Sequence, residues 1–141
     1  MIAPREKLWS TPPEVISQAV AMLQLTANDI VYDIGSGDGR FLFHCAEHCV
    51  VKRVVGVEIH RERAESTQRT ITARGWSEKC TILHSNALEL TYSDATAVFL
   101  YLVPRGLRLM LSILKAAVRS GSPLRVVTYM RYITVPKYPS L

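Results

Sequence analysis

The stretch VYDIGSGDGR, residues 31–40, decides the fold of this chain. Its apolar first half is typical of a buried strand in a parallel sheet. Three glycines at alternate positions permit positive φ angles and a close approach of the backbone to a ligand. A helix expected from Arg40 onward directs its unpaired N–H groups at this turn. A strand, a glycine-rich turn and a helix in this order predict a site for a nucleotide-like cofactor.

The spacing of the glycines bears on the kind of cofactor. A dinucleotide-binding loop has the pattern G-x-G-x-x-G, whose third glycine falls at a position that Arg40 occupies here. The third glycine of this chain is Gly39 instead. Glu58 ends the apolar stretch 53–58, at the distance from the loop where an acidic residue binds ribose hydroxyls. The spacing argues against NAD, although a variant NAD loop and a turn without any ligand remain alternatives.

The composition indicates a single domain over residues 1–141, with a leading helical segment over 1–28. The chain is 48% hydrophobic and 21% charged, which is typical of a globular protein and excludes a disordered one. No apolar run is long enough for a transmembrane helix, and no signal peptide is visible. Three cysteines without framework spacing predict an intracellular, reducing compartment, by default the cytoplasm.

The formal net charge of +5 favours an acidic partner, but the charges are spread along the chain. The arginines of the stretch 60–74 alternate with glutamates, so a solvated helix face explains them better than a nucleic-acid patch. The segment 44–49 pairs two histidines and two cysteines at i, i+4. These pairs lie about 100° apart on one helix, so we predict no metal site. Cys45 and Cys49 are interpreted as core residues.

Helical and strand patterns alternate along the chain. Helices are expected over 12–25, 40–49, 60–74 and 107–118, and strands over 30–34, 53–58, 81–84, 97–102 and 124–130. This alternation predicts an open, mostly parallel α/β sheet with helices on both faces. For its strands we take the order 3-2-1-4-5 of doubly wound folds. At the first helix, Thr11 is expected to be the cap and Glu14 to complete a capping box. Alternatively, Ser10 and Thr11 contact the ligand.

The pattern D-x-G-x-G-x-G at residues 33–39, followed by V-G-V-E at 55–58, resembles class I S-adenosylmethionine-dependent methyltransferases. The resemblance implies their Rossmann-like, seven-strand fold. Residues 131–141 are too few for its last helix and antiparallel hairpin, so the C-terminal strands are expected to be missing or shortened. A truncation, a minimal variant of the fold and an edge covered by a second chain are the three explanations. The last of these implies a homo-oligomer formed through the exposed sheet edge.

Four segments in order narrow the resemblance: STPPEV at residues 10–15, VYDIGSGDGR at 31–40, VGVE at 55–58 and YLVP at 101–104. Together they resemble a family of small protein-lysine methyltransferases, whose animal members act in mitochondria on the ATP synthase c subunit and the adenine nucleotide translocator. The resemblance implies S-adenosylmethionine as cofactor, S-adenosylhomocysteine as product, a protein substrate and a mitochondrial alternative for location. A small-molecule or nucleic-acid acceptor, and a cofactor-binding module without turnover, stay open.

In an open α/β sheet the ligand lies at the carboxyl ends of the strands, where the strand order reverses. Asp33 is expected to orient the loop or to bind the amino-acid end of the cofactor, and Glu58 to bind the ribose. Asn86 stands where the family has an acidic residue for the adenine amino group, and its carbonyl oxygen can accept that bond. The implied cofactor-binding residues are Thr11, Asp33, Gly35, Ser36, Gly37, Asp38, Gly39, Glu58, Ile59, Asn86, Ala87 and Tyr101.

The acceptor side is expected at the end of the fourth strand, where Leu102, Val103 and Pro104 face the substrate. Methyl transfer from a sulfonium mainly requires that the acceptor be positioned and water excluded. We therefore assign no catalytic base. Tyr101 and Tyr129 are candidates to orient an amine, although an ordinary strand residue is the favoured interpretation of each.

Overall fold

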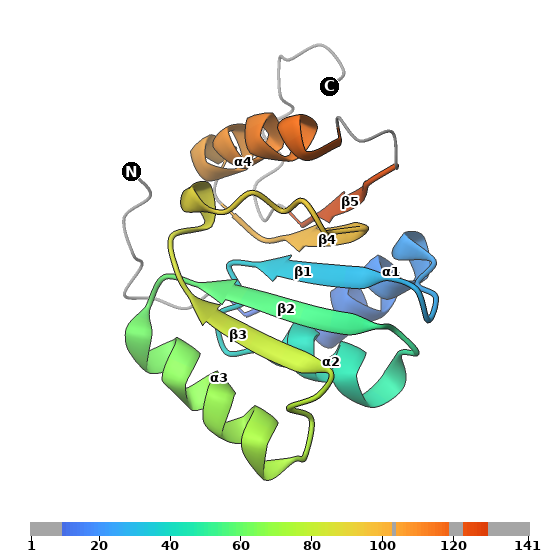
Figure 1. The fold of residues 1–141 in the computed structure, drawn as a ribbon, viewed down its shortest axis with the longest axis vertical. Coiled ribbons are helices and arrows are strands. Elements are labelled where there is room, and N and C mark those ends of the chain that lie inside the picture. Colours follow the sequence, from blue (N-terminus) through green and yellow to red (C-terminus); the bar gives the residue numbers. More distant parts are fainter. Residues whose placement is uncertain (1–9, 103, 119–122, 130–141) are drawn as a thin grey trace.

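The computed structural model describes residues 10–102, 104–118 and 123–129. Their strands form one parallel sheet in the order β3-β2-β1-β4-β5, which confirms the predicted order 3-2-1-4-5 (Figure 1). The predicted contents of residues 130–141 lie outside the described residues. No helix in the described part of the chain has the length and apolar character needed to cross a membrane. The strands are β1 (Ile30–Ile34), β2 (Arg53–Glu58), β3 (Cys80–His84), β4 (Ala97–Leu100) and β5 (Arg125–Thr128).

Helices cover both faces of the sheet, as the alternation predicts (Figure 1). Buried side chains of α1, α2 and α3 pack with Val31 and Phe99 on one face. Buried side chains of α4 pack with Tyr32 and Val98 on the other face, where the 3-10 helix η1 also lies. The period of two along β1 explains this division, because neighbouring residues of a strand point to opposite faces. The helices are α1 (Pro13–Leu23), α2 (Arg40–His48), α3 (Arg61–Ala73), η1 (Ala87–Glu89) and α4 (Pro104–Ala117).

The predicted capping box at the start of α1 is wrong. The helix begins at Pro13, and its N-cap residue is Pro12, which makes no side-chain cap bond. The Pro12 carbonyl instead accepts from the backbone N–H groups of Val15 and Ile16, at 3.0 and 3.1 Å. Two successive prolines shift the helix start one residue beyond the predicted cap, so Thr11 precedes the cap and is buried away from the helix end.

A buried polar network closes the edge of the sheet where the strands begin. The Asp29 carboxylate accepts hydrogen bonds from the backbone N–H of Thr26 at 2.7 Å and from the Thr96 hydroxyl at 2.7 Å. It also pairs with the guanidinium of Arg125 at the start of β5. Arg125 donates in addition to the carbonyl oxygens of Leu23 and Gln24, at 2.6 and 3.0 Å. This network connects the end of α1 to three strands. It lies at the end of the sheet where the strands begin, opposite the glycine loop (residues 35–39).

Candidate functional site

The glycine loop lies directly on the carboxyl end of β2. The N–H groups of Gly35 and Ser36 both donate to the Val57 carbonyl, at 2.9 and 3.0 Å. Gly35, Gly37 and Gly39 have φ angles of 76°, 60° and 84°, in the left-handed region that side chains disfavour. The three glycines are therefore needed for the backbone path of the loop itself.

Gly56 is needed beneath this loop, in a role that was not predicted. A Cβ atom at Gly56 would lie 2.9 Å from Cδ1 of Ile82 and 3.3 Å from both Cβ and Oγ of Ser36. The bare backbone of β2 thus lets the glycine loop sit close to the sheet. A glycine inside an apolar strand signals such a close approach, so this role was readable from the sequence.

The Glu58 carboxylate ends β2 and holds the glycine loop. It is 4% exposed, its Oε1 accepts from the Gly37 N–H at 2.8 Å, and its Oε2 accepts from the His60 N–H at 2.8 Å. Each carboxylate oxygen can accept a second hydrogen bond. The side chain is thus fixed in place with acceptor capacity left, which suits the predicted bond to ribose hydroxyls. That bond stays a prediction.

Asp33, like Ser36, is a predicted cofactor-binding residue with a buried side-chain oxygen that has no hydrogen-bond partner among the described residues. The residue is 2% exposed, and its Oδ2 makes no hydrogen bond. Burial, together with the neighbouring charges of Glu58 and Asp38, raises the pKa of Asp33 to about 8. A buried carboxyl in such a place is stabilised in its ionised form by a cation or a strong donor. This arrangement favours a positively charged group of a ligand beside Asp33.

A pocket of about 280 Å³, which includes its open mouth, lies in front of Asp33 between the glycine loop and the end of β4. It brings together seven of the predicted cofactor-binding residues and Ser10, the alternative ligand contact. Arg40, Phe41 and Phe99 also line it, and none of these three had a predicted contact with the ligand. Phe41 stacks on Phe99 with ring centroids 4.3 Å apart. The lining residues are Ser10, Thr11, Asp33, Gly35, Ser36, Gly37, Asp38, Arg40, Phe41, Phe99 and Tyr101.

The segment before α1 is held over this pocket by Asp38 and Arg40. The Ser10 hydroxyl donates to Asp38 Oδ2 at 3.1 Å, and Arg40 Nη1 donates to the Thr11 carbonyl at 3.3 Å. Arg40 also pairs with Asp38, with Nη2 and Oδ2 2.8 Å apart. Burial alone raises the pKa of Asp38, but the hydrogen bonds and charge of Arg40 outweigh it and lower that pKa. Ser10 and Thr11 thus lie at the pocket, and neither caps the helix.

Five predicted cofactor residues lie outside the pocket lining: Gly39, Glu58, Ile59, Asn86 and Ala87. Asn86 Oδ1 accepts from the Leu88 N–H at 3.0 Å and caps η1. The Ile59 carbonyl lies 3.1 Å from Nε2 of His84, and the Ala87 carbonyl accepts from the Tyr92 hydroxyl at 2.6 Å. A contact of these residues with adenine stays a prediction.

The two candidate tyrosines meet at the ends of β4 and β5. Their rings pack edge to face, with centroids 4.9 Å apart, and both residues are half-buried. Leu102 is half-buried and packs against the core on the α4 face of the sheet, and its Cδ2 would be 3.1 Å from a Cβ atom at Gly35. Val103 lies outside the described residues, and Pro104 begins α4. The predicted acceptor side therefore borders the glycine loop.

The loop does not form an anion cradle. The N–H groups of Gly35, Ser36 and Gly37 are all engaged within the protein, and three carboxylates surround the loop. A pyrophosphate needs free N–H donors and positive charge, so a dinucleotide fits this site poorly. S-adenosylmethionine carries a sulfonium and an ammonium, and the unpartnered Asp33 carboxyl suits such charges. Within the described ranges, no group of three or more histidine, cysteine or acidic residues can hold a metal ion.

Comparisons with known proteins also indicate a methyltransferase. Residues 33–132 match the family described as the ANTKMT methyltransferase domain. A protein-lysine N-methyltransferase of Saccharolobus islandicus (strain REY15A) is 32% identical over 119 residues, which cover 84% of this chain and 73% of the relative. A crystal structure of an RNA methyltransferase from Salinibacter ruber, in complex with S-adenosyl-L-homocysteine, has a TM-score of 0.71 at 28% identity and covers 75% of this chain and 69% of that chain.

The fold extends to more distant relatives. Precorrin 8w decarboxylase from Methanobacterium thermoautotrophicum has a TM-score of 0.74 at 20% identity and covers 89% of this chain and 67% of that one. Fold, site and relatives together define a class I, Rossmann-like S-adenosylmethionine-dependent methyltransferase, which confirms the predicted fold, class and cofactor. The chain belongs to the ANTKMT methyltransferase domain family.

Proposed function

We propose that this protein transfers a methyl group from S-adenosylmethionine to the side-chain amine of a lysine in a protein substrate. The observation that carries the lysine assignment is the 32% identity to a protein-lysine N-methyltransferase, over most of both chains. The site geometry supports it, because a half-buried aromatic pair lies beside the glycine loop, where the reacting amine has to enter.

The cofactor supplies an activated methyl group on a positively charged sulfur, so the residues of the chain have to bind, orient and exclude water. We propose that Asp33 binds the ammonium of the cofactor, Glu58 its ribose and Asn86 its adenine, with Ile59 and Ala87 alongside. Asp33 and Glu58 are buried and preorganised for these contacts.

On the acceptor side, we propose that Tyr101, Tyr129 and Leu102 surround the lysine side chain. A lysine amine is nucleophilic only when it is neutral. Removal from water lowers a lysine pKa, and so does a neighbouring cation. The half-buried rings and the sulfonium together favour the neutral amine at this place.

Two further proposals concern the cellular compartment and the self-association of the protein. Cys45, Cys49 and Cys80 are all free thiols, which supports a reducing compartment, either the cytoplasm or the mitochondrion. Strand β5 has a neighbour on one side in the described sheet, so we propose self-association of the protein through that edge.

The acceptor class can be tested with methyl-labelled S-adenosylmethionine and cell extract. Matched samples are treated with protease or ribonuclease after the reaction, and proteins are hydrolysed for amino-acid analysis. The proposal predicts label in methyl-lysine. RNA is the second candidate, because the Salinibacter ruber relative is an RNA methyltransferase. Label that ribonuclease removes would establish that candidate instead. Cofactor binding without label in any fraction would indicate a module without turnover.

A further inference from the structure

Helix α4 exposes cations along one side and contains no acidic residue at all. Arg105, Arg108, Ser112 and Lys115 are exposed, at the spacing of three and four residues that aligns side chains on one helix face. Leu109 lies among them and is 39% exposed. We call the exposed residues Arg105, Arg108, Leu109 and Lys115 the α4 stripe.

This imbalance of charge distinguishes α4 from the other cation-rich helix. Helix α3 also exposes Arg61 and Arg69, but its exposed Glu62 and Glu65 offset them. The segment η1, which packs against α4, contributes one exposed acid, Glu89. Among the described residues, the α4 stripe thus carries three cations against this one acid.

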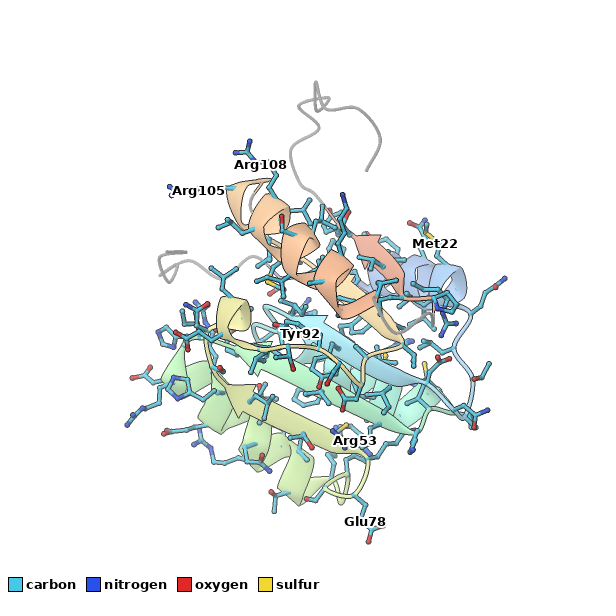
Figure 2. The ribbon with its side chains drawn as sticks, turned by 45° about the horizontal axis from the view of Figure 1, so that its top comes forward. Met22, Arg53, Glu78, Tyr92, Arg105 and Arg108 are labelled. Atoms are coloured by element: carbon cyan, nitrogen blue, oxygen red, sulfur yellow. The ribbon has the colours of Figure 1, made fainter. Side chains whose placement is uncertain are left out.

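The stripe begins beside the acceptor side of the methyl-transfer site. Helix α4 starts at Pro104, two residues after Leu102. Figure 2 shows Arg105 and Arg108 at this end of the helix, directed away from the sheet. The first turn of α4 carries no acidic side chain, and cations there oppose the helix dipole. The helix dipole thus gives no reason for cations at this end of α4.

We propose that the α4 stripe binds an acidic segment of the protein acceptor, next to the lysine that is methylated. This inference rests on the proposed function. The distance along the axis from residue 105 to residue 115 is about 15 Å, which matches about five extended residues or three helical turns of a partner. Leu109 adds apolar contact between the cations.

The stripe fits an acidic peptide better than a single-stranded nucleic acid. Nucleic-acid surfaces combine a basic groove with aromatic rings on which bases stack. The sequence of α4, PRGLRLMLSILKAA, contains no aromatic residue. The carboxylates of Asp38 and Glu58 at the glycine loop also repel a phosphate backbone.

The test compares two short labelled peptides, each with one central lysine, whose flanking residues are either glutamate or glutamine. Binding to the full chain with S-adenosylhomocysteine present is measured by fluorescence anisotropy at low and physiological salt. We expect the glutamate peptide to bind more tightly and to weaken as salt is added. The variant R105Q/R108Q should bind it about tenfold more weakly and treat both peptides nearly alike.

The matched control is K52Q/R69Q, which removes two exposed cations remote from α4. It should keep the preference for the glutamate peptide. Equal affinity of the wild-type protein for both peptides would overturn the inference, as would equal losses in the two variants. If R105Q/R108Q instead lost affinity for a labelled RNA oligonucleotide and kept its affinity for the glutamate peptide, the α4 stripe would be a nucleic-acid-binding surface. A wild-type protein that fails to bind S-adenosylhomocysteine by calorimetry would instead refute the proposed function, so the two failures are distinct.

Discussion

Asp33 shows how one residue couples burial to ligand binding. Its carboxyl is enclosed by the protein, lacks a hydrogen bond at Oδ2 and faces the negative charges of Glu58 and Asp38. Burial and these charges raise its pKa to about 8, so the carboxyl is mostly protonated at neutral pH. A cationic cofactor reverses this balance, because an adjacent positive charge favours the ionised form.

Binding of S-adenosylmethionine near pH 7 should therefore release a proton from Asp33. We expect calorimetry in buffers of different ionisation enthalpy to detect this release, and D33N to abolish it while weakening binding by about 1.5–3 kcal/mol. Affinity should rise with pH up to about 8. An unchanged binding enthalpy across the buffers, after correction for dilution, would rule out the coupling.

The raised pKa of Asp33 also determines how the free energy of unfolding changes with pH. A carboxyl whose folded pKa is raised from 3.8 to about 8 binds more protons in the folded than in the unfolded state. Its stabilising contribution is full below pH of about 4 and is lost as pH rises through about 8. The free energy of unfolding of D33N should lack this fall between the two values, as urea titrations across that range will show.

Among elements, the glycine loop depends on the bare backbone of β2 below it. The substitution G56A should push Ser36 upward and weaken the bonds that Gly35 and Ser36 donate to Val57. Overpacking of this kind costs about 1–3 kcal/mol in unfolding free energy. Urea titration measures that cost, and calorimetry with S-adenosylhomocysteine measures the loss of affinity.

A second variant distinguishes the two residues, Ile82 and Ser36, that the methyl group added in G56A would contact. In G56A/I82V the Cδ1 atom of Ile82, 2.9 Å from the added Cβ, is removed. We expect stability to recover in part and the affinity for S-adenosylhomocysteine to stay low, because the contact with Ser36 remains. Full recovery of affinity would show that the loop does not depend on Gly56.

The elements of the fold were predictable where burial controls the pattern. The five strands were predictable from the sequence, most clearly β1, β2 and β4, because these central strands are buried on both faces. The end of β4 differs: it was expected at residue 102 and lies at Leu100, where its pairing with β5 ends. Local patterns do not show how far two strands pair.

Site residues were predictable where the local sequence determines their position, and not where the packing of distant segments does. The glycine loop and Tyr101 were found because they follow strands directly. Phe41 and Phe99 were missed, because their stacking depends on how α2 packs on the sheet. The cap at Thr11 was wrong because two prolines follow it and Arg40 binds its carbonyl, a contact between distant segments.

At the scale of the whole molecule, the network around Asp29 joins α1 to the end of the sheet where the strands begin. Burial alone raises the pKa of Asp29, but its bonds from Thr96 and Thr26 and the charge of Arg125 outweigh it and lower that pKa. A depressed folded pKa gives stability that is present above the unfolded value and is lost as pH falls through the folded value.

The substitution D29N should therefore lower the unfolding free energy by about 1–3 kcal/mol at pH 7. The difference from the wild-type protein should shrink as the pH falls below about 4, where Asp29 protonates in the unfolded chain, and should vanish below its lowered pKa in the folded state. D94N, which alters a more exposed carboxylate, provides the comparison. A deficit for D29N that is the same at every pH would exclude an ionic contribution.

The central claim is that the glycine loop and Glu58 bind S-adenosylmethionine. It is tested most directly by calorimetric titration of the wild-type protein and of E58A with S-adenosylmethionine and S-adenosylhomocysteine. The account predicts saturable binding of both compounds to one site, weakened in E58A by at least about 1–3 kcal/mol, because the loop loses its anchor and the ribose its acceptor. Equal affinities of the two proteins, or no binding to the wild-type protein, would contradict it.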